Sequence, residues 1–499
     1  MAAETTPDPK AAGGSAAAYY LKLASGPVAF ALTMLLPLDL STQGRIALAT
    51  FACAAVWWIT QPMPWAIAAL LPMLVFPATG TMSISATLSL YGHPIFFWIM
   101  GTVLMGYAIE KHGLARRFAI GFLAMPGLGG RMRRLTFAYM AVTGLTSMFV
   151  TDTAVIAMLM PIGMALVRHI QAPQAAGAAP ATNLAAFMTL ATFYGALAGG
   201  TATMVGIPHN AIAISLLEDF TGRTLGWFDW MVAGVPVYLA LLVSFYLLLW
   251  IMVPPEVTHA PGGEAFLREE RAKLGPVSSN ERRVLGVFAV MVLLFTLPTL
   301  VSLALGADHR WTAAVQRALP IWVVPPALMV LLFTVPAAGG RADQALLGWK
   351  EAERNTPWNV MILVVGAVAM TEALTKFGFV DFMGGIVREL GLGRTALPYV
   401  AGILAAVTTN FISGTAATAL YCSIFIPASV SADFNPASMA ILIANVCLGL
   451  ALPWAGAAAA TTFSVGQIDM GRMIRVGIPA TLIFAIITAT IHLLMAPFV

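Results

Sequence analysis

The chain has 499 residues, of which 59% are hydrophobic and only 10% are charged, and its formal net charge is +4. Soluble domains carry about a quarter charged residues, so this composition excludes a soluble globular protein and predicts one built for the lipid bilayer. A small excess of lysine and arginine is ordinary in a multi-pass membrane protein, and it requires no nucleic-acid partner. Cys53, Cys422 and Cys447 lie in apolar stretches and predict neither a disulfide framework nor a metal site.

The N-terminal segment, residues 1–20, is polar and rich in small side chains, and it lacks the basic start of a signal peptide. We expect a flexible cytoplasmic tail there, followed by scaffold helices over 21–91. Apolar runs of about 17–25 residues, long enough to cross a bilayer, recur from there to the C-terminus. They predict an all-α polytopic membrane protein with about eleven transmembrane helices plus two shorter paired segments.

Lysine and arginine gather in four segments, 116–134, 268–283, 341–354 and 472–475. The positive-inside rule places such segments on the cytoplasmic side. We therefore expect a multi-pass protein of the cell inner (plasma) membrane with a cytoplasmic N-terminus.

Two parts of the chain repeat the same order of features. The spacing of Gly101, Lys111 and Gly113 recurs at Gly366, Lys376 and Gly378. In each part a short polar turn follows, at 151–153 in the first and at 413–415 in the second. A stretch interrupted by glycine and proline comes next, at 199–213 in the first part and at 450–463 in the second. Such repeats are typical of secondary transporters. The basic segment 116–134 follows the first glycine–lysine–glycine stretch, whereas the basic segment 341–354 precedes the second. Because both basic segments are expected in the cytoplasm, the two repeats enter the membrane from opposite sides, and the symmetry is inverted.

This symmetry divides the rest of the chain into regions. They are a first inverted repeat over 92–254 (transport helices, a hairpin over 134–168, then a scaffold helix), a cytoplasmic linker over 255–283, scaffold helices over 284–336, and a second inverted repeat over 337–499 (a hairpin over 396–428, a broken helix over 436–466 and a last helix).

The polar turns are expected at the tips of the two hairpins. Backbone at membrane depth leaves the helix only where it lines protein or water, so we expect re-entrant hairpins whose tips meet near the middle of the bilayer. Free carbonyl oxygens at such tips suit a small cation, and the helix starts that follow them suit an anion.

Asp152, in the first polar turn, is an acid inside the membrane and for that reason a functional candidate. Three interpretations stay open. Asp152 is an ionised ligand of a cation, a protonated carboxyl that couples transport to protons, or an N-cap of the following helix through the Thr153 and Ala154 N–H groups. In the first two, an anion binds only after Na⁺ or H⁺ has neutralised Asp152. His209, at the start of a broken helix, is a weaker candidate for contact with an anion.

These motifs resemble those of the divalent anion/sodium symporter (DASS) family, the citrate, dicarboxylate and sulfate transporters of the ion transporter superfamily. The resemblance covers nearly the whole chain and rests on two hairpin tips, which read Ser-Asn-Thr in the family, and on two loops ending in Pro-Pro-Asn-Ala. It implies an elevator mechanism, in which a transport domain moves against a fixed scaffold, and it implies a homodimer.

The resemblance also implies the residues of the site. Around the substrate fall Asp152, Thr153, Ile207, Pro208, Ser413, Gly414, Thr415, Gly456 and Ala457. Around Na⁺ fall Ser147, Thr151, Asp152 and Gly206 for one ion, and Thr409, Ile412, Gly414 and Ala455 for a second. Na⁺ is the expected coupling ion, with H⁺ as the alternative.

The chain departs from the family at both tips, which read Thr-Asp-Thr and Ser-Gly-Thr, so an amide is lost from each. His209 stands in the first loop where the family has proline, and Gly456-Ala457-Ala458-Ala459 stands in the second loop for Thr-Pro-Pro-Asn. These changes favour a substrate that is bulkier, less charged or held from one side, such as a monocarboxylate or sulfonate.

The function predicted from these observations is cation-coupled uptake of a small organic or inorganic anion, a carboxylate, dicarboxylate, sulfate or sulfonate. The alternative is a Na⁺/H⁺ antiporter or an arsenite-type efflux carrier of the same superfamily, whose members also carry aspartate near a hairpin tip. The sequence offers no nucleophile–base constellation and no phosphate-binding loop, so we predict no enzymatic activity. The expected partners are the anion, the bilayer and a second copy of the chain.

Overall fold

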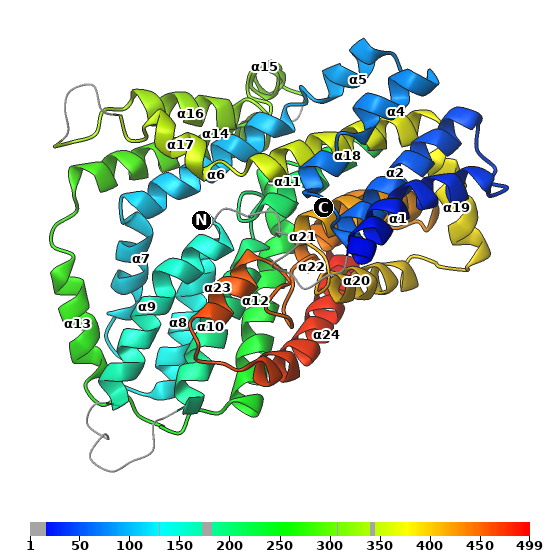
Figure 1. Cartoon of the computed structure of the whole chain (residues 1–499). Coiled ribbons are helices and arrows are strands. Elements are labelled where there is room, and N and C mark those ends of the chain that lie inside the picture. The colour runs from blue at the N-terminus through cyan, green and yellow to red at the C-terminus, as the bar shows by residue number, and fades with distance from the viewer. Residues whose placement is uncertain (1–15, 129, 172–181, 307, 340–344) are drawn as a thin grey trace.

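The computed structural model describes residues 16–499 except 129, 172–181, 307 and 340–344, and this part of the chain is almost entirely helical (Figure 1). Most of the predicted N-terminal tail, residues 1–15, lies outside the described residues, as does Arg341 of the third basic segment. A helix already begins at Ala16.

The helices before and within the first repeat are α1 (Ala16–Leu35), α2 (Thr42–Thr60), α3 (Trp65–Ala68), α4 (Leu71–Thr79), α5 (Ile84–Leu90), α6 (Ile95–Lys111), α7 (Leu114–Leu123), α8 (Met132–Ser147), α9 (Asp152–Gln171), α10 (Thr182–Gly200), α11 (Pro208–Thr221) and α12 (Trp227–Met252). Those that follow are α13 (Gly263–Lys273), α14 (Ser279–Leu305), α15 (Arg310–Ala318), α16 (Val324–Thr334), α17 (Trp349–Asn355), α18 (Trp358–Lys376), α19 (Phe379–Glu389), α20 (Ala396–Thr408), α21 (Gly414–Ser431), α22 (Pro436–Val446), α23 (Ala457–Ser464) and α24 (Met470–Met495).

Within the described residues, 7 helical stretches are long and apolar enough to cross a membrane, and shorter apolar helices accompany them. Leucine, valine and alanine fill all faces of these helices, which is the pattern of a helix surrounded by lipid or by other helices. The predicted all-α, polytopic membrane class is confirmed.

Both predicted hairpins are pairs of helices joined by a short turn. α8 and α9 flank the turn 148–151, and α20 and α21 flank the turn 409–413. Both predicted breaks are also present. Residues 201–207 separate α10 from α11, and residues 447–456 separate α22 from α23.

The two glycines that the sequence pattern matched make equivalent contacts. Gly101 of α6 faces α16, where an added β-carbon would lie 2.5 Å from the Pro325 carbonyl oxygen. Gly366 of α18 faces the end of α3, where an added β-carbon would overlap the Ala69 carbonyl oxygen. Each glycine therefore lets a long helix lie directly on the backbone of a short one, as small residues do in membrane helix packing.

The second halves of the broken helices are exchanged between the two parts of the chain. α11 packs against α21 and α22, whereas α23 packs against α9 and α10 (Figure 1). Each hairpin thus lies beside one segment from its own half and one from the other half.

Ion pairs fasten one end of the bundle. Lys111, at the end of α6, contacts Glu351 of α17 at 2.6 Å, and Arg117 of α7 contacts Glu281 of α14 at 2.7 Å. The hydrogen bond from the Lys111 ammonium holds the pKa of the Glu351 carboxyl below its usual range. Arg117 brings the beginning of the basic segment 116–134 to this end, and the start of α6 lies at the opposite end.

Gly366→Ala is expected to destabilise the protein by about 1–3 kcal/mol, because the new methyl group has no room against Ala69. The midpoint of thermal unfolding in detergent should fall accordingly. Gly286→Ala, in the first third of α14, is the matched control, since no described atom lies within 4 Å of its added β-carbon. Equal midpoints for the two variants would contradict the close contact between α18 and α3.

Candidate functional site

The first hairpin tip is held by the break in the first broken helix. The Thr203 hydroxyl donates a hydrogen bond to the Met148 carbonyl oxygen, which ties the turn 148–151 to the loop 201–207. On its other side the turn faces α6, where a β-carbon on Gly106 would lie 3.6 Å from the Phe149 carbonyl oxygen. The tip therefore sits between the break and α6.

Asp152 is the first residue of α9 and is half-buried. Its Oδ1 accepts a hydrogen bond of 2.7 Å from the Thr153 N–H and lies 3.3 Å from the Thr153 hydroxyl, which donates to it. Of the two expected capping contacts, the one to the Thr153 N–H is present. Asp152 is, however, already the first helical residue, and the cap position falls at Thr151, whose carbonyl oxygen accepts from the Val155 N–H. The carboxylate lies at the start of a helix, where the helix dipole stabilises negative charge, and the cation and proton interpretations of Asp152 stay predictions.

The loop 201–207 is closed by Asn210. Its side-chain nitrogen donates hydrogen bonds to the carbonyl oxygens of Gly200, at 3.1 Å, and Thr203, at 2.8 Å. A β-carbon on Gly206 would overlap the Gly200 carbonyl oxygen, so this crossing of the chain requires glycine at 206. The sequence did not predict a role for Asn210 or for Thr203.

Two buried oxygens beside Gly200 have no hydrogen-bond partner in the part of the chain that the structure describes, Ser147 Oγ and Asn210 Oδ1. Both residues are fully buried. A buried oxygen without a donor is costly, and hydroxyl, amide and carboxylate oxygens are the ligands that hard cations prefer. The residues present therefore fit a Na⁺ ion at the first predicted position, with Asn210 added to the predicted set.

The second tip is also held by a break, through Asn410. Its Oδ1 accepts hydrogen bonds from the N–H groups of Leu450, at 3.1 Å, and Ala451, at 2.8 Å. Its side-chain nitrogen donates to the Ala406 carbonyl oxygen at 2.9 Å. The predicted residues Thr409 and Ile412 beside it are buried. Asn410 was missed too, although a buried polar side chain next to a predicted site residue is itself a signal.

The second tip touches the start of α11. A β-carbon on Gly414 would lie 2.8 Å from His209 Nε2 and would overlap the Cys447 carbonyl oxygen. His209 Nδ1 is buried without a hydrogen-bond partner among the described residues. The imidazole therefore occupies space beside the tip, and the tip has room for glycine alone.

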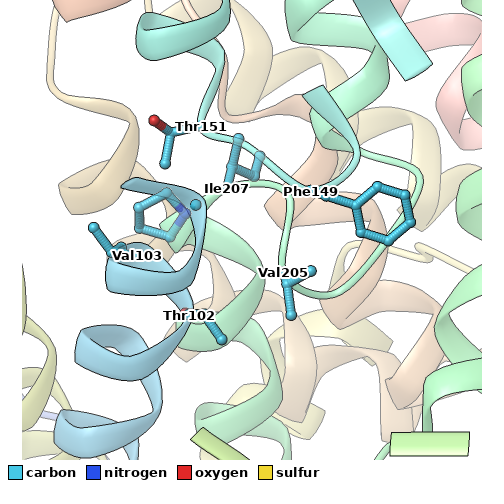
Figure 2. A pocket seen from close by; sticks show the side chains of 8 residues that line it. Thr102, Val103, Phe149, Thr151, Val205 and Ile207 are labelled. Carbon is cyan, nitrogen blue, oxygen red and sulfur yellow. The ribbon is translucent and has the colours of Figure 1, made fainter. Parts of the chain in front are cut away.

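A small cavity brings the first tip to the same segment. It is lined by Thr102, Val103, Gly106, Phe149, Thr151, Val205, Ile207 and Pro208. Figure 2 shows Thr151 and Ile207 on one side of this space, with Thr102 and Val103 of α6 facing them. The start of α11, residues 207–209, thus lies between the two tips and contacts both.

Two other predicted residues lie apart from this meeting point. Gly456 and Ala457, at the start of α23, are exposed, and no described atom lies within 4 Å of a β-carbon added to Gly456. Ala455 just before them is buried. The second half of the site is therefore more open than the first.

Comparison with known proteins gives one family. The family described as "Sodium:sulfate symporter transmembrane region" matches residues 18–498. The sodium-dependent dicarboxylate transporter SdcS of Staphylococcus saprophyticus is 27% identical over 481 residues, covering 95% of this chain and 90% of that protein. Its namesake from Staphylococcus aureus (strain bovine RF122 / ET3-1) is 26% identical over 484 residues, with the same 95% and 90% coverage.

Two solved structures have a similar fold. One is the YdaH transporter of Alcanivorax borkumensis, with a TM-score of 0.52 and 12% identity, covering 83% of this chain and 87% of that one. The other is MtrF of Neisseria gonorrhoeae, with a TM-score of 0.56 and 13% identity, covering 96% and 94%. At these identities the likeness concerns the fold alone.

Gly414→Ala is expected to weaken anion binding about tenfold or more, because the overlap at the second tip costs about 1–3 kcal/mol. Binding to the purified protein, measured by the protection that an added anion gives against thermal unfolding, checks this. Gly456→Ala is the matched control, since this second predicted site glycine has extended backbone, with φ 168°, and open space around it. Unchanged binding by the Gly414 variant would contradict the close contact with His209 and Cys447.

Proposed function

Because this chain belongs to the sodium:sulfate symporter family, with residues 18–498 matching it, we propose that it is a secondary active transporter in which Na⁺ drives uptake of a small anion. Membership confirms the family that the hairpin motifs resembled and makes the chain a multi-pass membrane transporter and not an enzyme. H⁺ is the alternative coupling ion.

The convergence of three helix starts carries this proposal. α9 begins at Asp152, α21 at Gly414 and α11 at Pro208, and the contacts of the two tips bring these starts to residues 207–209. Helix starts present N–H groups and a positive dipole end, which attract anions. The unpartnered oxygens of Ser147 and Asn210, beside the first tip, are suited to bind a cation.

The substrate class follows from what faces the meeting point. The relatives named as sodium-dependent dicarboxylate transporters support a carboxylate. The second tip has no side-chain amide, because position 414 is glycine. His209 instead presents an imidazole beside that tip. We therefore place one acidic group of the substrate between His209 and the helix starts, with Asp152, Thr153, Ser413 and Thr415 around it. A carboxylate, dicarboxylate, sulfate or sulfonate meets this description.

Charge balance makes the cation necessary. An ionised Asp152 repels an anion at the same helix start, and a cation held by Ser147, Thr151, Asp152 and Gly206 removes that repulsion. A second Na⁺ is proposed at Thr409, Ile412, Gly414 and Ala455. Cation and anion then stabilise one another, so each binds more tightly when the other is present.

The same proposal includes an elevator movement within a homodimer. The equivalent contacts of Gly101 and Gly366, and the exchange of α11 and α23, support two inverted repeats. α6 packs on α16 and α14, α18 packs on α3 and α2, and both also pack on α11. We therefore keep α6 and α18 with the hairpins, α10, α11, α22 and α23 in the transport domain, which would move against the scaffold helices α2, α3, α14 and α16.

Asp152→Asn tests the charge balance in proteoliposomes. We expect labelled dicarboxylate uptake by the wild type to rise with an inward Na⁺ gradient, and Na⁺ stimulation to fall about tenfold or more in the variant, since a charged ligand is worth about 1.5–3 kcal/mol. Asp469→Asn is the matched control, because Asp469 caps α24 with a hydrogen bond of 2.9 Å from the Arg472 N–H and is 73% exposed.

The outcomes separate the candidate functions. Wild-type Na⁺ dependence in the Asp152 variant would refute its role in cation binding. Na⁺/H⁺ exchange by the wild type without any anion would refute the symporter and favour the antiporter.

A further inference from the structure

Four titratable side chains gather at the end of α11 remote from the anion site. Glu218 and Asp219 lie in the last turn of α11, His93 precedes α6, and Glu372 lies in the last turns of α18. This is the end of α6 opposite Lys111 and its ion pair with Glu351. None of the four residues belongs to the predicted site.

The contacts within this group leave its negative charge largely uncompensated. His93 Nε2 lies 3.9 Å from Asp219 Oδ1, and the exposed fractions of the two side chains are 18% and 11%. The Trp322 indole N–H donates a hydrogen bond of 3.0 Å to Glu218 Oε2. Glu218 is the neighbour of Asp219 in the chain, and Glu372 lies on α18, which packs against α11. Among the described contacts of these three carboxylates, His93 is the basic group that approaches within 4 Å.

Two buried polar atoms in the second half of α11 have no hydrogen-bond partner among the described residues. They are Asp219 Oδ2 and Ser215 Oγ, one helical turn earlier on the same face of α11. Ser215 is fully buried. Trp98 Nε1 on α6 and Thr375 Oγ1 on α18 also lack a partner among the described residues, and both helices pack against α11. Such a set of orphaned atoms indicates a missing ligand.

A proton is the ligand that this chemistry takes. Nearby carboxylates shielded from water cannot all be ionised, so one of them binds a proton. Among the described residues no group of His, Cys, Asp and Glu side chains has the arrangement for a metal ion. A protonated Asp219 gains an O–H donor, and Ser215 Oγ offers an acceptor one turn away.

We propose that Asp219 binds a proton from the aqueous phase at this end of the molecule, in a site completed by Ser215, Glu218, Glu372 and His93. The hydrogen bond from the Trp322 indole favours the ionised form of Glu218, whereas Asp219 Oδ2 has no donor among the described residues. The proton and the transported anion thus bind at opposite ends of α11.

The other groups that face α11 do not neutralise this site. α6, α18, α21 and α22 pack against α11. Lys376 ends α18 and lies 5.8 Å from the centre of the Phe377 ring. Arg223, after α11, approaches Asn435 Oδ1 at 3.4 Å. The remaining titratable side chains on these elements are His209 at the far end of α11, Tyr107, Glu110 and Lys111 at the far end of α6, and Tyr421 and Cys422 on α21.

Proton binding would govern how α11 lies against α18. An ionised Asp219 repels Glu372 across the contact between the two helices, and protonation removes that repulsion. Because α11 also carries Pro208 and His209, protonation favours the arrangement in which the start of α11 lies between the tips. This consequence rests on the proposed function, whereas proton binding itself does not.

Potentiometric titration of the purified protein tests proton binding directly. The difference between wild type and Asp219→Asn should show one proton per chain, released in a step more than about one pH unit above the ordinary aspartate value of about 3.9. Asp469→Asn, at a capping residue at the start of α24, is the matched control; hydrogen bonding from the Arg472 backbone holds the pKa of Asp469 below the usual range, so its step should lie lower than the ordinary value. A step for Asp219 at the ordinary value would overturn the proposal.

Ser215→Ala keeps the carboxylate and serves if Asp219→Asn does not fold. It removes the acceptor of the protonated form, so the step should move about 0.5–1 pH unit lower. An unmoved step would overturn the role of Ser215 in the site.

A transport measurement separates this proposal from the proposed function. Na⁺-driven anion uptake by the wild type should change across the pH range of the titration step, and uptake by Asp219→Asn should not. Wild-type uptake with the same pH profile as the variant would overturn the coupling of the proton to transport. Absence of Na⁺-driven uptake at every pH, with the titration step intact, would refute the proposed function alone.

Discussion

The structure depends on one constraint: where the chain leaves the helix inside the bilayer, its backbone polar groups must find partners within the protein. Two asparagines meet this demand at the two breaks. Asn210 donates to carbonyl oxygens of the loop 201–207, and Asn410 accepts from N–H groups of the loop 447–456. Thr203 adds a bond from the first break to the first tip. The same bonds that make the breaks tolerable therefore fix the tips beside them, so the site exists because the backbone had to be satisfied there.

Close approach decides which side chains this site can hold. Gly206 and Gly414 both lie against backbone carbonyl oxygens, and neither position has room for a β-carbon. At position 414 the side-chain amide of the family's tip is absent. On the facing helix α11, His209 stands where the family has proline, and its imidazole lies beside the tip. The polar group is thus supplied from α11 rather than from the hairpin. Such an exchange alters the chemistry offered to a substrate while the tip and the break keep their contact.

The hairpins, the breaks and the membrane class could be predicted from the sequence, because each depends on local features. These features are the length of the apolar runs, a short polar turn, and clustered glycine and proline. The family could be predicted for the same reason. The role of Asn410 could not be predicted, because it is defined by a contact with a segment far away in the chain. His209 was named as a candidate for contact with an anion, but its position beside the second tip could not be predicted for the same reason. The group at Asp219 was invisible too, since His93, Glu218 and Glu372 come from three separate helices or their ends. Gly456 and Ala457 were placed by resemblance to the family, and in the structure they are exposed.

The two halves of the molecule share one plan but differ in charge. In its last turn α11 carries Glu218 and Asp219, of which Asp219 approaches a single imidazole, that of His93. After α23, the corresponding element, the acid is Asp469, which is 73% exposed, and hydrogen bonding from the Arg472 backbone holds its pKa below the usual range. Asp469 therefore stays ionised whatever the position of α23. If Asp219 binds a proton as proposed, a change of pH alters the charge at the end of α11 and leaves Asp469 ionised, so the two corresponding helices respond unequally. A proton site in only one of two inverted repeats would give the pair a preferred side of the membrane.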